Sequence, residues 1–208
     1  GGGAPPPPPP PADPSTAAAQ RQTILAAEDN RLALPEGLPT LDIPPGVTLR
    51  ADRRTVLSSG VIRTQYASAN MLNVAGNEVR ITGLRIQGPN RSNSHQSQSN
   101  AISIHESVIQ HTIVDHNDIS DWPWRGVYVH ADETTDACTD ESDPLGRPAA
   151  TWVARNFIHH NRSKEKGYGV NANSGGFPLI EGNVFYENRH AIAGTAPTSH
   201  TGYRAWYN

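Results

Sequence analysis

One short phrase, an Asn followed two residues later by a large apolar residue, recurs along this chain at long and unequal intervals. It reads NDISDW at 117–122, NFIHHN at 156–161 and NVFYEN at 183–188. The spacing is too long for a β-hairpin and too irregular for a helical array. When the copies are aligned on their first Asn, apolar residues also recur three positions before it. The aligned positions are Leu84, Asn117, Asn156, Asn183 and Asn208, preceded by Ile81, Val114, Val153, Ile180 and Ala205 and followed by Ile86, Ile119, Ile158 and Phe185.

A second phrase recurs between the Asn phrases, and it alternates polar residues with small or apolar ones. The four copies are AISIH (101–105), GVYVH (126–130), GVNAN (169–173) and AIAGT (191–195). A period of two predicts a β-strand with one inward and one outward face. The inward residues are Ile102, Ile104, Val127, Val129, Val170 and Ala172. The outward residues are Ser103, His105, Tyr128, His130, Asn171 and Asn173.

Together the two phrases predict an all-β fold, a right-handed parallel β-helix built as a solenoid of one chain. A single turn cannot bury its own apolar face, so successive turns must stack on one another. Asn suits the corner of a turn, because it tolerates a left-handed φ and its amide can bond to the Asn of the turns above and below. The competing interpretation is a β-sandwich with coincidental phrases. A sandwich should show hairpin turns every 8–12 residues, whereas the two strand phrases of this chain keep a fixed order across four units.

Composition divides the chain into a tail and a domain. Residues 1–30 contain a Gly- and Pro-rich tract that favours extended polyproline II, so we expect a linker there and the β-helix domain at 31–208. No capping segment follows Asn208, so we expect further coils beyond it. The net charge of −3 does not favour a nucleic-acid partner, and no apolar run is long enough to span a membrane. Such Pro-rich spacers are typical of exported proteins, which predicts a secreted or cell-surface location.

Several stretches resemble the pectate-lyase-like superfamily of right-handed parallel β-helix proteins. LPEG (34–37) with LDIPPGVTLRADRRTVL (41–57) looks like the opening of such a domain. GVYV with VARNFIHHN (153–161), and GYGVNA with LIEGNVFYENRHAIAG (179–194), are similar to its periodic coils. The NRHAIAG phrase suggests an uncharacterised bacterial branch. The resemblance implies the fold over 31–208 and a ligand cleft outside the first strand sheet, but that fold carries lyases, hydrolases, epimerases, tailspikes and adhesins.

The repeat alignment places polar residues in columns on the outside of this first sheet. The column before the strands is Asn100, Arg125, Tyr168 and His190. The first outward column is Ser103, Tyr128, Asn171 and Ala193, and the second is His105, His130, Asn173 and Thr195. Aromatic faces stack on sugar rings, while Asn, His and Arg bond hydroxyl and carboxylate groups. The columns therefore predict a polysaccharide or oligosaccharide site, although polar residues on a sheet face can also serve solubility alone.

The candidate catalytic residues are His190, Tyr168 and Arg125. His and Tyr could act as base and acid in β-elimination beside a uronate, and Arg could neutralise the carboxylate. The candidate substrate-binding residues are Tyr128, His130, Asn171, Asn173, His105 and Arg189. We predict an exported carbohydrate-active protein acting on an acidic polysaccharide, lyase- or epimerase-like. The alternative is a non-catalytic glycan-binding or structural module at the cell surface.

No metal site is predicted, and no cofactor is required by this chemistry. Six acids between Asp132 and Asp143 could bind Ca²⁺ or simply form a solvated loop. The outward columns lack the Asp residues with which classical pectate lyases hold Ca²⁺, which argues against that activity. His159 and His160 are expected to point to opposite sides at a strand end, which makes them a poor chelate.

Overall fold

The computed structural model describes residues 31–33, 40–51, 61–63, 70–89, 99–106, 109, 111–131, 151–195 and 201–208. The predicted linker at 1–30 lies outside these residues. The described secondary structure is entirely β, in eighteen strands, β1 to β18.

The strands form three six-stranded sheets, in which every pair is parallel. Sheet A contains β1 (Arg31–Ala33), β4 (Val61–Arg63), β7 (Arg85–Gln87), β10 (Asp118–Ser120), β13 (Phe157–His159) and β16 (Val184–Tyr186). Sheet B contains β2 (Leu41–Ile43), β5 (Leu72–Val74), β8 (Asn100–His105), β11 (Arg125–His130), β14 (Tyr168–Asn173) and β17 (His190–Thr195). Sheet C contains β3 (Thr48–Arg50), β6 (Arg80–Thr82), β9 (Ile113–Asp115), β12 (Trp152–Ala154), β15 (Leu179–Glu181) and β18 (Arg204–Trp206).

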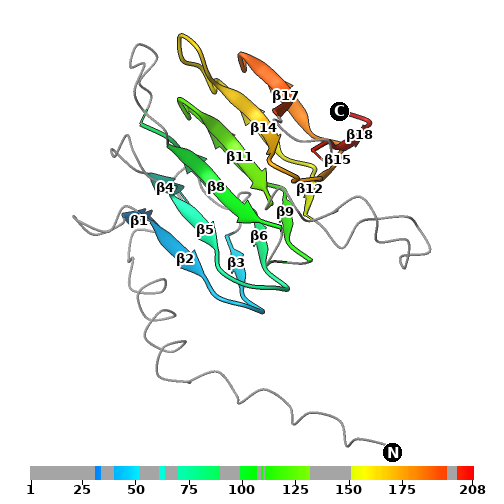
Figure 1. Cartoon of the computed structure of the whole chain (residues 1–208). Helices are drawn as coiled ribbons and strands as arrows, with labels where there is room; N and C mark the ends of the chain where they lie inside the picture. The colour runs from blue at the N-terminus through cyan, green and yellow to red at the C-terminus, as the bar shows by residue number, and fades with distance from the viewer. Residues whose placement is uncertain are drawn as a thin grey trace, which may run out of the picture.

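Consecutive strands pass through sheets A, B and C in turn, so every third strand lies beside its counterpart in the next turn (Figure 1). This arrangement is a parallel β-helix, and the prediction of that fold is confirmed. The β-sandwich interpretation is excluded, because a sandwich is built from antiparallel sheets.

The core is a set of apolar files that run along the helix axis. Ile86, Ile119, Ile158 and Phe185 pair in register in sheet A, as the alignment on Asn predicts. Ile81, Val114, Val153 and Ile180 form the matching file in sheet C, and all four side chains are fully buried. Burial of these files is the main stabilising contribution, because no single turn encloses a core of its own.

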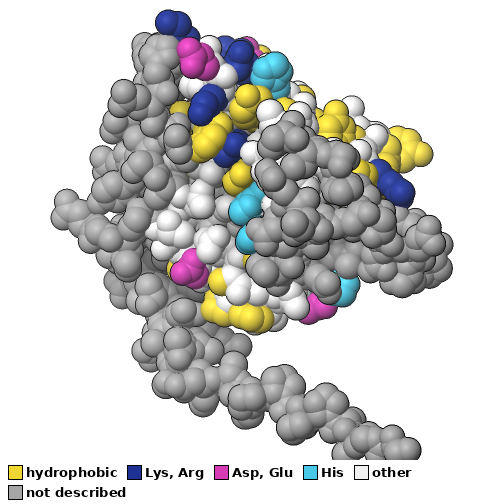
Figure 2. All heavy atoms as spheres, viewed as in Figure 1, with side chains coloured by type: hydrophobic (Ala, Val, Ile, Leu, Met, Phe, Trp, Pro, Cys, Tyr) yellow, Lys and Arg dark blue, Asp and Glu magenta, His cyan; other side chains and the backbone are white. Residues whose placement is uncertain are grey.

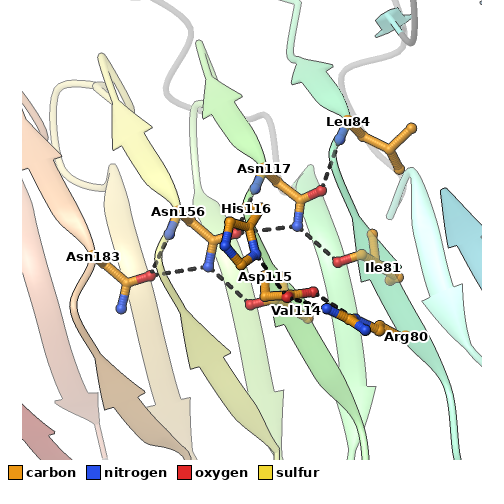
Figure 3. A network of polar contacts seen from close by, with 9 residues as sticks. All are labelled: Arg80, Ile81, Leu84, Val114, Asp115, His116, Asn117, Asn156 and Asn183. Carbon is orange, nitrogen blue, oxygen red and sulfur yellow. Dashed lines mark hydrogen bonds and ion pairs between the residues drawn. The ribbon is translucent and has the colours of Figure 1, made fainter. Parts of the chain in front are cut away.

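The corner between sheets C and A carries a ladder of Asn side chains, shown in Figure 3. The Nδ2 atom of Asn117 donates to Oδ1 of Asn156 (3.1 Å), and Nδ2 of Asn156 donates to Oδ1 of Asn183 (2.9 Å). Asn183 donates to Asn208 in the same way (2.9 Å). Each Oδ1 also accepts the backbone N–H of the preceding turn, beginning with Leu84. The predicted stacking is therefore confirmed.

The left-handed φ predicted for these Asn residues is wrong by one position. The residue before the Asn adopts it instead, with φ values of 56° at His116, 54° at Arg155 and 61° at Gly182. At each corner, therefore, the residue before the Asn makes the sharp backbone turn. The Asn that follows points its side-chain amide inward, where it forms hydrogen bonds along the helix axis.

A second ladder lies at the corner between sheets A and B, where each Asn phrase ends. Asn161 Nδ2 donates to Asn188 Oδ1 (2.8 Å), and Asn188 Nδ2 donates to the Ile158 carbonyl (2.8 Å). One turn earlier Trp122 takes the place of Asn: its backbone N–H donates to Asn161 Oδ1, and its indole Nε1 donates to the Ile86 carbonyl (3.1 Å). This explains why NDISDW ends in Trp where the other phrases end in Asn.

Candidate functional site

The outer face of sheet B carries the predicted columns in the predicted register. The first column pairs Asn100, Arg125, Tyr168 and His190 across β8, β11, β14 and β17. The other two pair Ser103, Tyr128, Asn171 and Ala193, and then His105, His130, Asn173 and Thr195. The inward residues Val127 and Val129 are fully buried in the core. The alternation of the strand therefore leaves Tyr128 and His130 on the outer face.

Five side chains on this face form one continuous stack, which we call the sheet B stack: His105, His130, Tyr128, Arg125 and Trp124. The imidazole rings of His105 and His130 stack at 4.5 Å between centroids, and His130 stacks on Tyr128 at 4.6 Å. The Arg125 guanidinium lies 3.8 Å from the Tyr128 centroid and 3.6 Å from that of Trp124. On the face over β8, β11 and β14, Figure 2 shows His, hydrophobic and basic side chains following one another in a file.

Arg125 is the most buried member of the sheet B stack. Its side chain is 5% exposed, and its Nε donates to Asn171 Oδ1 at 2.7 Å. Burial lowers the pKa of Arg125 to about 10, an effect that the nearby Tyr128 and Tyr168 partly oppose. Among the described residues, no carboxylate forms an ion pair with this guanidinium. A buried cation without a counterion is costly unless other groups stabilise it.

A second cation lies at the end of the sheet B stack. The Lys166 Nζ atom lies 4.1 Å from the Trp124 ring centroid, so Arg125 and Lys166 both contact the same indole. Within the described part of the chain, Lys166 also has no carboxylate partner. Two cations held at one aromatic ring create a local positive site on a chain whose net charge is −3.

Asn171, a predicted ligand contact, lies beneath Arg125 with its amide fully engaged. Its Oδ1 accepts from Arg125, and its Nδ2 donates to Thr195 Oγ1 (2.7 Å) and to the Ala193 carbonyl (3.2 Å). The residue is completely buried. The structure thus gives Asn171 the place of a support that orients the guanidinium from below.

The remaining predicted residues lie around the sheet B stack. Tyr168 and His190 stack on each other at 5.4 Å in the neighbouring turns, and His190 is exposed. Asn173 Nδ2 lies 3.4 Å from the Tyr128 hydroxyl. The Arg189 guanidinium donates to the Glu165 carbonyl in the turn before β14. The structure therefore brings Arg125, Tyr128 and His130 together, with the Tyr168–His190 pair beside them.

One member of this site was missed by sequence reasoning. Trp124 lies one residue before β11, in the phrase PWRG, and it was not singled out. Lys166 lies in the turn before β14 with Arg162 and Lys164; the sequence allows these residues to reach over the cleft to an acidic glycan, but it favours the simpler interpretation of a solvated basic turn. The available signal was an aromatic residue next to the only Arg in the outward columns, since Arg commonly packs on aromatic faces.

The prediction that His159 and His160 point to opposite sides is wrong. Their Nδ1 atoms lie 2.6 Å apart, because φ at His160 is 54° and turns its side chain toward that of His159. The acidic run at 132–143 lies outside the described residues. Among the residues that are described, no group of three or more His, Cys, Asp or Glu side chains is placed to hold a metal ion. No helix of membrane-spanning length and hydropathy occurs in the same part of the chain.

Comparisons with protein family models, with curated proteins and with solved structures found no match for this chain. The fold is therefore identified by its own topology, as a parallel β-helix.

Proposed function

We propose that the outer face of sheet B binds an acidic polysaccharide, with Arg125 and Lys166 receiving the carboxylate of a uronate unit. The observation that carries this proposal is the pair of cations at Trp124, neither of which has a carboxylate partner among the described residues. A ligand carboxylate would supply the missing counterion. The Gly- and Pro-rich stretch at 1–30 is typical of spacers in exported proteins, so the proposal includes a secreted or cell-surface location.

The Arg125 side chain leaves one edge for such a ligand. Trp124 and Tyr128 cover the two faces of the guanidinium, and Asn171 occupies its Nε. The two Nη atoms remain as the donors that match a carboxylate in the bidentate manner. Lys166 adds a second charge at the same indole. Arg125 thus offers a pre-oriented fork, and holding it in place lowers the entropy lost on binding.

The half-buried rings of Tyr128, His130 and His105 extend the site along strand β11 and, at His105, onto β8 of the neighbouring turn. Tyr128 and His130 stack at 4.6 Å on one strand, and His130 stacks on its paired residue His105 at 4.5 Å. A polysaccharide chain lying along this file would contact the outward edges of these rings, because their faces cover one another. The proposed ligand is therefore a chain and not a single sugar.

The proposed chemistry is proton abstraction beside the bound carboxylate, as in a lyase or an epimerase. Neutralising the carboxylate makes the adjacent C–H bond more acidic. Tyr168 or His190 would remove that proton. In a lyase the electron pair then forms a C=C bond while the glycosidic C–O bond breaks, and the leaving oxygen takes a proton. In an epimerase a second group returns a proton to the opposite face.

A non-catalytic glycan-binding module is the second candidate, and one observation favours it. Among the described residues, no hydrogen bond to the side chain of Tyr168 or His190 orients its ring. The hydrogen bonds of these two residues are those of backbone pairing. A catalytic base is normally held by a third group. With no such group, the same face would bind the glycan and release it unchanged.

The test is a screen of uronate-containing polysaccharides, with a neutral polysaccharide as the control ligand. Binding is measured by calorimetry, and turnover by the ultraviolet absorbance of an unsaturated product and by the stereochemistry of the recovered sugar. Turnover that Tyr168→Phe or His190→Ala abolishes, with binding retained, supports the enzyme. Binding without turnover supports the second candidate. Equal binding of neutral and acidic chains would refute both, because the cations would have no role.

A further inference from the structure

A second cluster of titratable side chains lies on the outer face of sheet A, at the corner that leads to sheet B. His159 ends β13, and His160 follows it in the left-handed conformation. Their Nδ1 atoms face each other at 2.6 Å. This cluster is separate from the sheet B stack, and nothing in the proposed glycan site uses it.

The other nitrogen of each imidazole faces a carboxylate. His159 Nε2 lies 2.8 Å from Asp118 Oδ1, and His160 Nε2 lies 3.2 Å from Glu187 Oε2. An ionised carboxylate only accepts hydrogen bonds, so both Nε2 atoms carry their proton. In neutral imidazoles both Nδ1 atoms are then lone-pair acceptors. Two acceptors at 2.6 Å repel each other unless a proton lies between them or both bind the same metal ion.

We propose that His159 and His160 form a two-nitrogen chelate for a divalent transition metal, with Cu²⁺ as the preferred ion. Imidazole nitrogens suit Cu²⁺, which stands highest among the divalent first-row metals in affinity for such ligands. Metal-ligating histidines commonly donate their second N–H to a carboxylate, and here Asp118 and Glu187 are placed to accept it. No third protein ligand lies within the described part of the chain, so the remaining positions are taken by water or by a ligand.

The geometry needs only a small adjustment to hold the ion. With metal–nitrogen bonds of about 2.0–2.1 Å, two ligands at a right angle lie about 2.9 Å apart. The present separation is 2.6 Å; the His160 side chain is 44% exposed and makes an edge contact with the Tyr186 ring. The His159 side chain is only 18% exposed and stacks on Phe157 at 4.1 Å between ring centroids. The two imidazoles lie close enough to serve as adjacent ligands of one ion, as in tetragonal Cu²⁺ sites.

The carboxylates beside His159 and His160 favour a bound cation, but each of them also has a basic partner. Asp118 also lies 3.7 Å from Arg85, and Glu187 lies 3.2 Å from Arg162. Each carboxylate therefore shares its charge between one guanidinium and one imidazole. In the turn before, Asp121 occupies the corner position that His160 occupies in its own turn. The Asp121 Oδ2 atom accepts a hydrogen bond from Gln87 Nε2 at 2.8 Å. The site is thus a pair of imidazoles oriented by carboxylates, and not an acidic cluster.

The test is a titration of the full chain with Cu²⁺ alone, followed by calorimetry and by electron paramagnetic resonance. The wild type should bind one equivalent tightly and show hyperfine coupling to two imidazole nitrogens. His160→Gln should lose that equivalent and that signature. Asp118→Asn and Glu187→Gln should each weaken the affinity by about 10–100-fold.

His116→Gln is the matched control. His116 is also a left-handed corner residue, and its Nδ1 bonds to Asp115 at 2.8 Å, but no second histidine pairs with it. This variant should bind Cu²⁺ as the wild type does. His159→Gln should also lose the bound Cu²⁺, and if that variant fails to fold, the exposed His160→Gln decides the question alone. Undiminished Cu²⁺ binding by His160→Gln would overturn the proposal, and so would a pair that shares a proton and binds no Cu²⁺.

Discussion

The side chain of Asn156 is bonded directly to that of Asn183 in the next turn: Asn183 Oδ1 accepts both the backbone N–H (3.0 Å) and the Nδ2 (2.9 Å) of Asn156. The Nδ2 of Asn156 also donates to the Val114 carbonyl in the turn before. The side-chain amide of Asn156 therefore links three successive turns by hydrogen bonds. The ladder lets the corner bury its backbone polar groups, which would otherwise be left without partners.

Asn156→Ala should lower the free energy of unfolding by about 2–5 kcal/mol, because it leaves the Asn117 N–H and the Val114 carbonyl buried without partners. Urea unfolding followed by circular dichroism measures the loss. Asn208→Ala is the control, since Asn208 is exposed and water can replace its amide. Equal losses for the two variants would contradict a buried ladder.

Gly169→Ala should destabilise the protein by about 1–3 kcal/mol through overpacking. A Cβ at this position would lie 2.5 Å from the Ala191 carbonyl oxygen and 2.9 Å from the Phe185 ring. Gly194→Ala on the neighbouring strand is the control, since its Cβ would meet only the Tyr203 ring, at 3.8 Å. Thermal unfolding compares the two variants, and an unchanged midpoint for Gly169→Ala would show that this strand pairing is looser than described.

Glu106 should make stability depend on pH. Its carboxylate is buried and accepts the backbone N–H groups of Thr151 (2.9 Å) and Phe177 (2.6 Å), yet burial outweighs these bonds and raises its pKa. The folded state then holds a proton that the unfolded state releases. The stabilisation from this bound proton is complete below about 4.5, the pKa of Glu106 in the unfolded state. It is lost as pH rises through the higher pKa of Glu106 in the folded state.

The measurement is the free energy of unfolding of the wild type relative to Glu106→Gln, which cannot titrate. That difference should become less favourable to the wild type as pH rises above about 4.5. A difference that grows with pH would mean that the two N–H bonds dominate and that the pKa is lowered instead.

Arg125→Gln should weaken binding of a uronate oligosaccharide by about 10–100-fold, the equivalent of losing charge-assisted hydrogen bonds worth about 1.5–3 kcal/mol. Because the pKa of Arg125 is about 10, wild-type affinity should hold through neutral pH and fall above that value, where the charge is lost. Calorimetry at several pH values measures both effects. Arg50→Gln, an exposed Arg on sheet C, should change neither. An equal loss in both variants would point to non-specific charge attraction.

From residue 81 onward, the sequence alone determined the turns of the β-helix and the register of their strands. Positions aligned on Asn117, Asn156 and Asn183 are the positions that pair, as with Ile119, Ile158 and Phe185. The register could be predicted because stacked turns must repeat the same apolar and corner residues, whatever the length of the loops between them.

The tertiary structure alone decided which outward side chains meet. The Arg125 guanidinium is sandwiched between Trp124 and Tyr128 and bonded to Asn171, which lies 46 residues away along the chain. The two histidines face each other because one corner torsion turns His160 back on His159. Side-chain rotamers and corner torsions depend on contacts with residues in adjacent turns, and no local pattern in the sequence encodes those contacts.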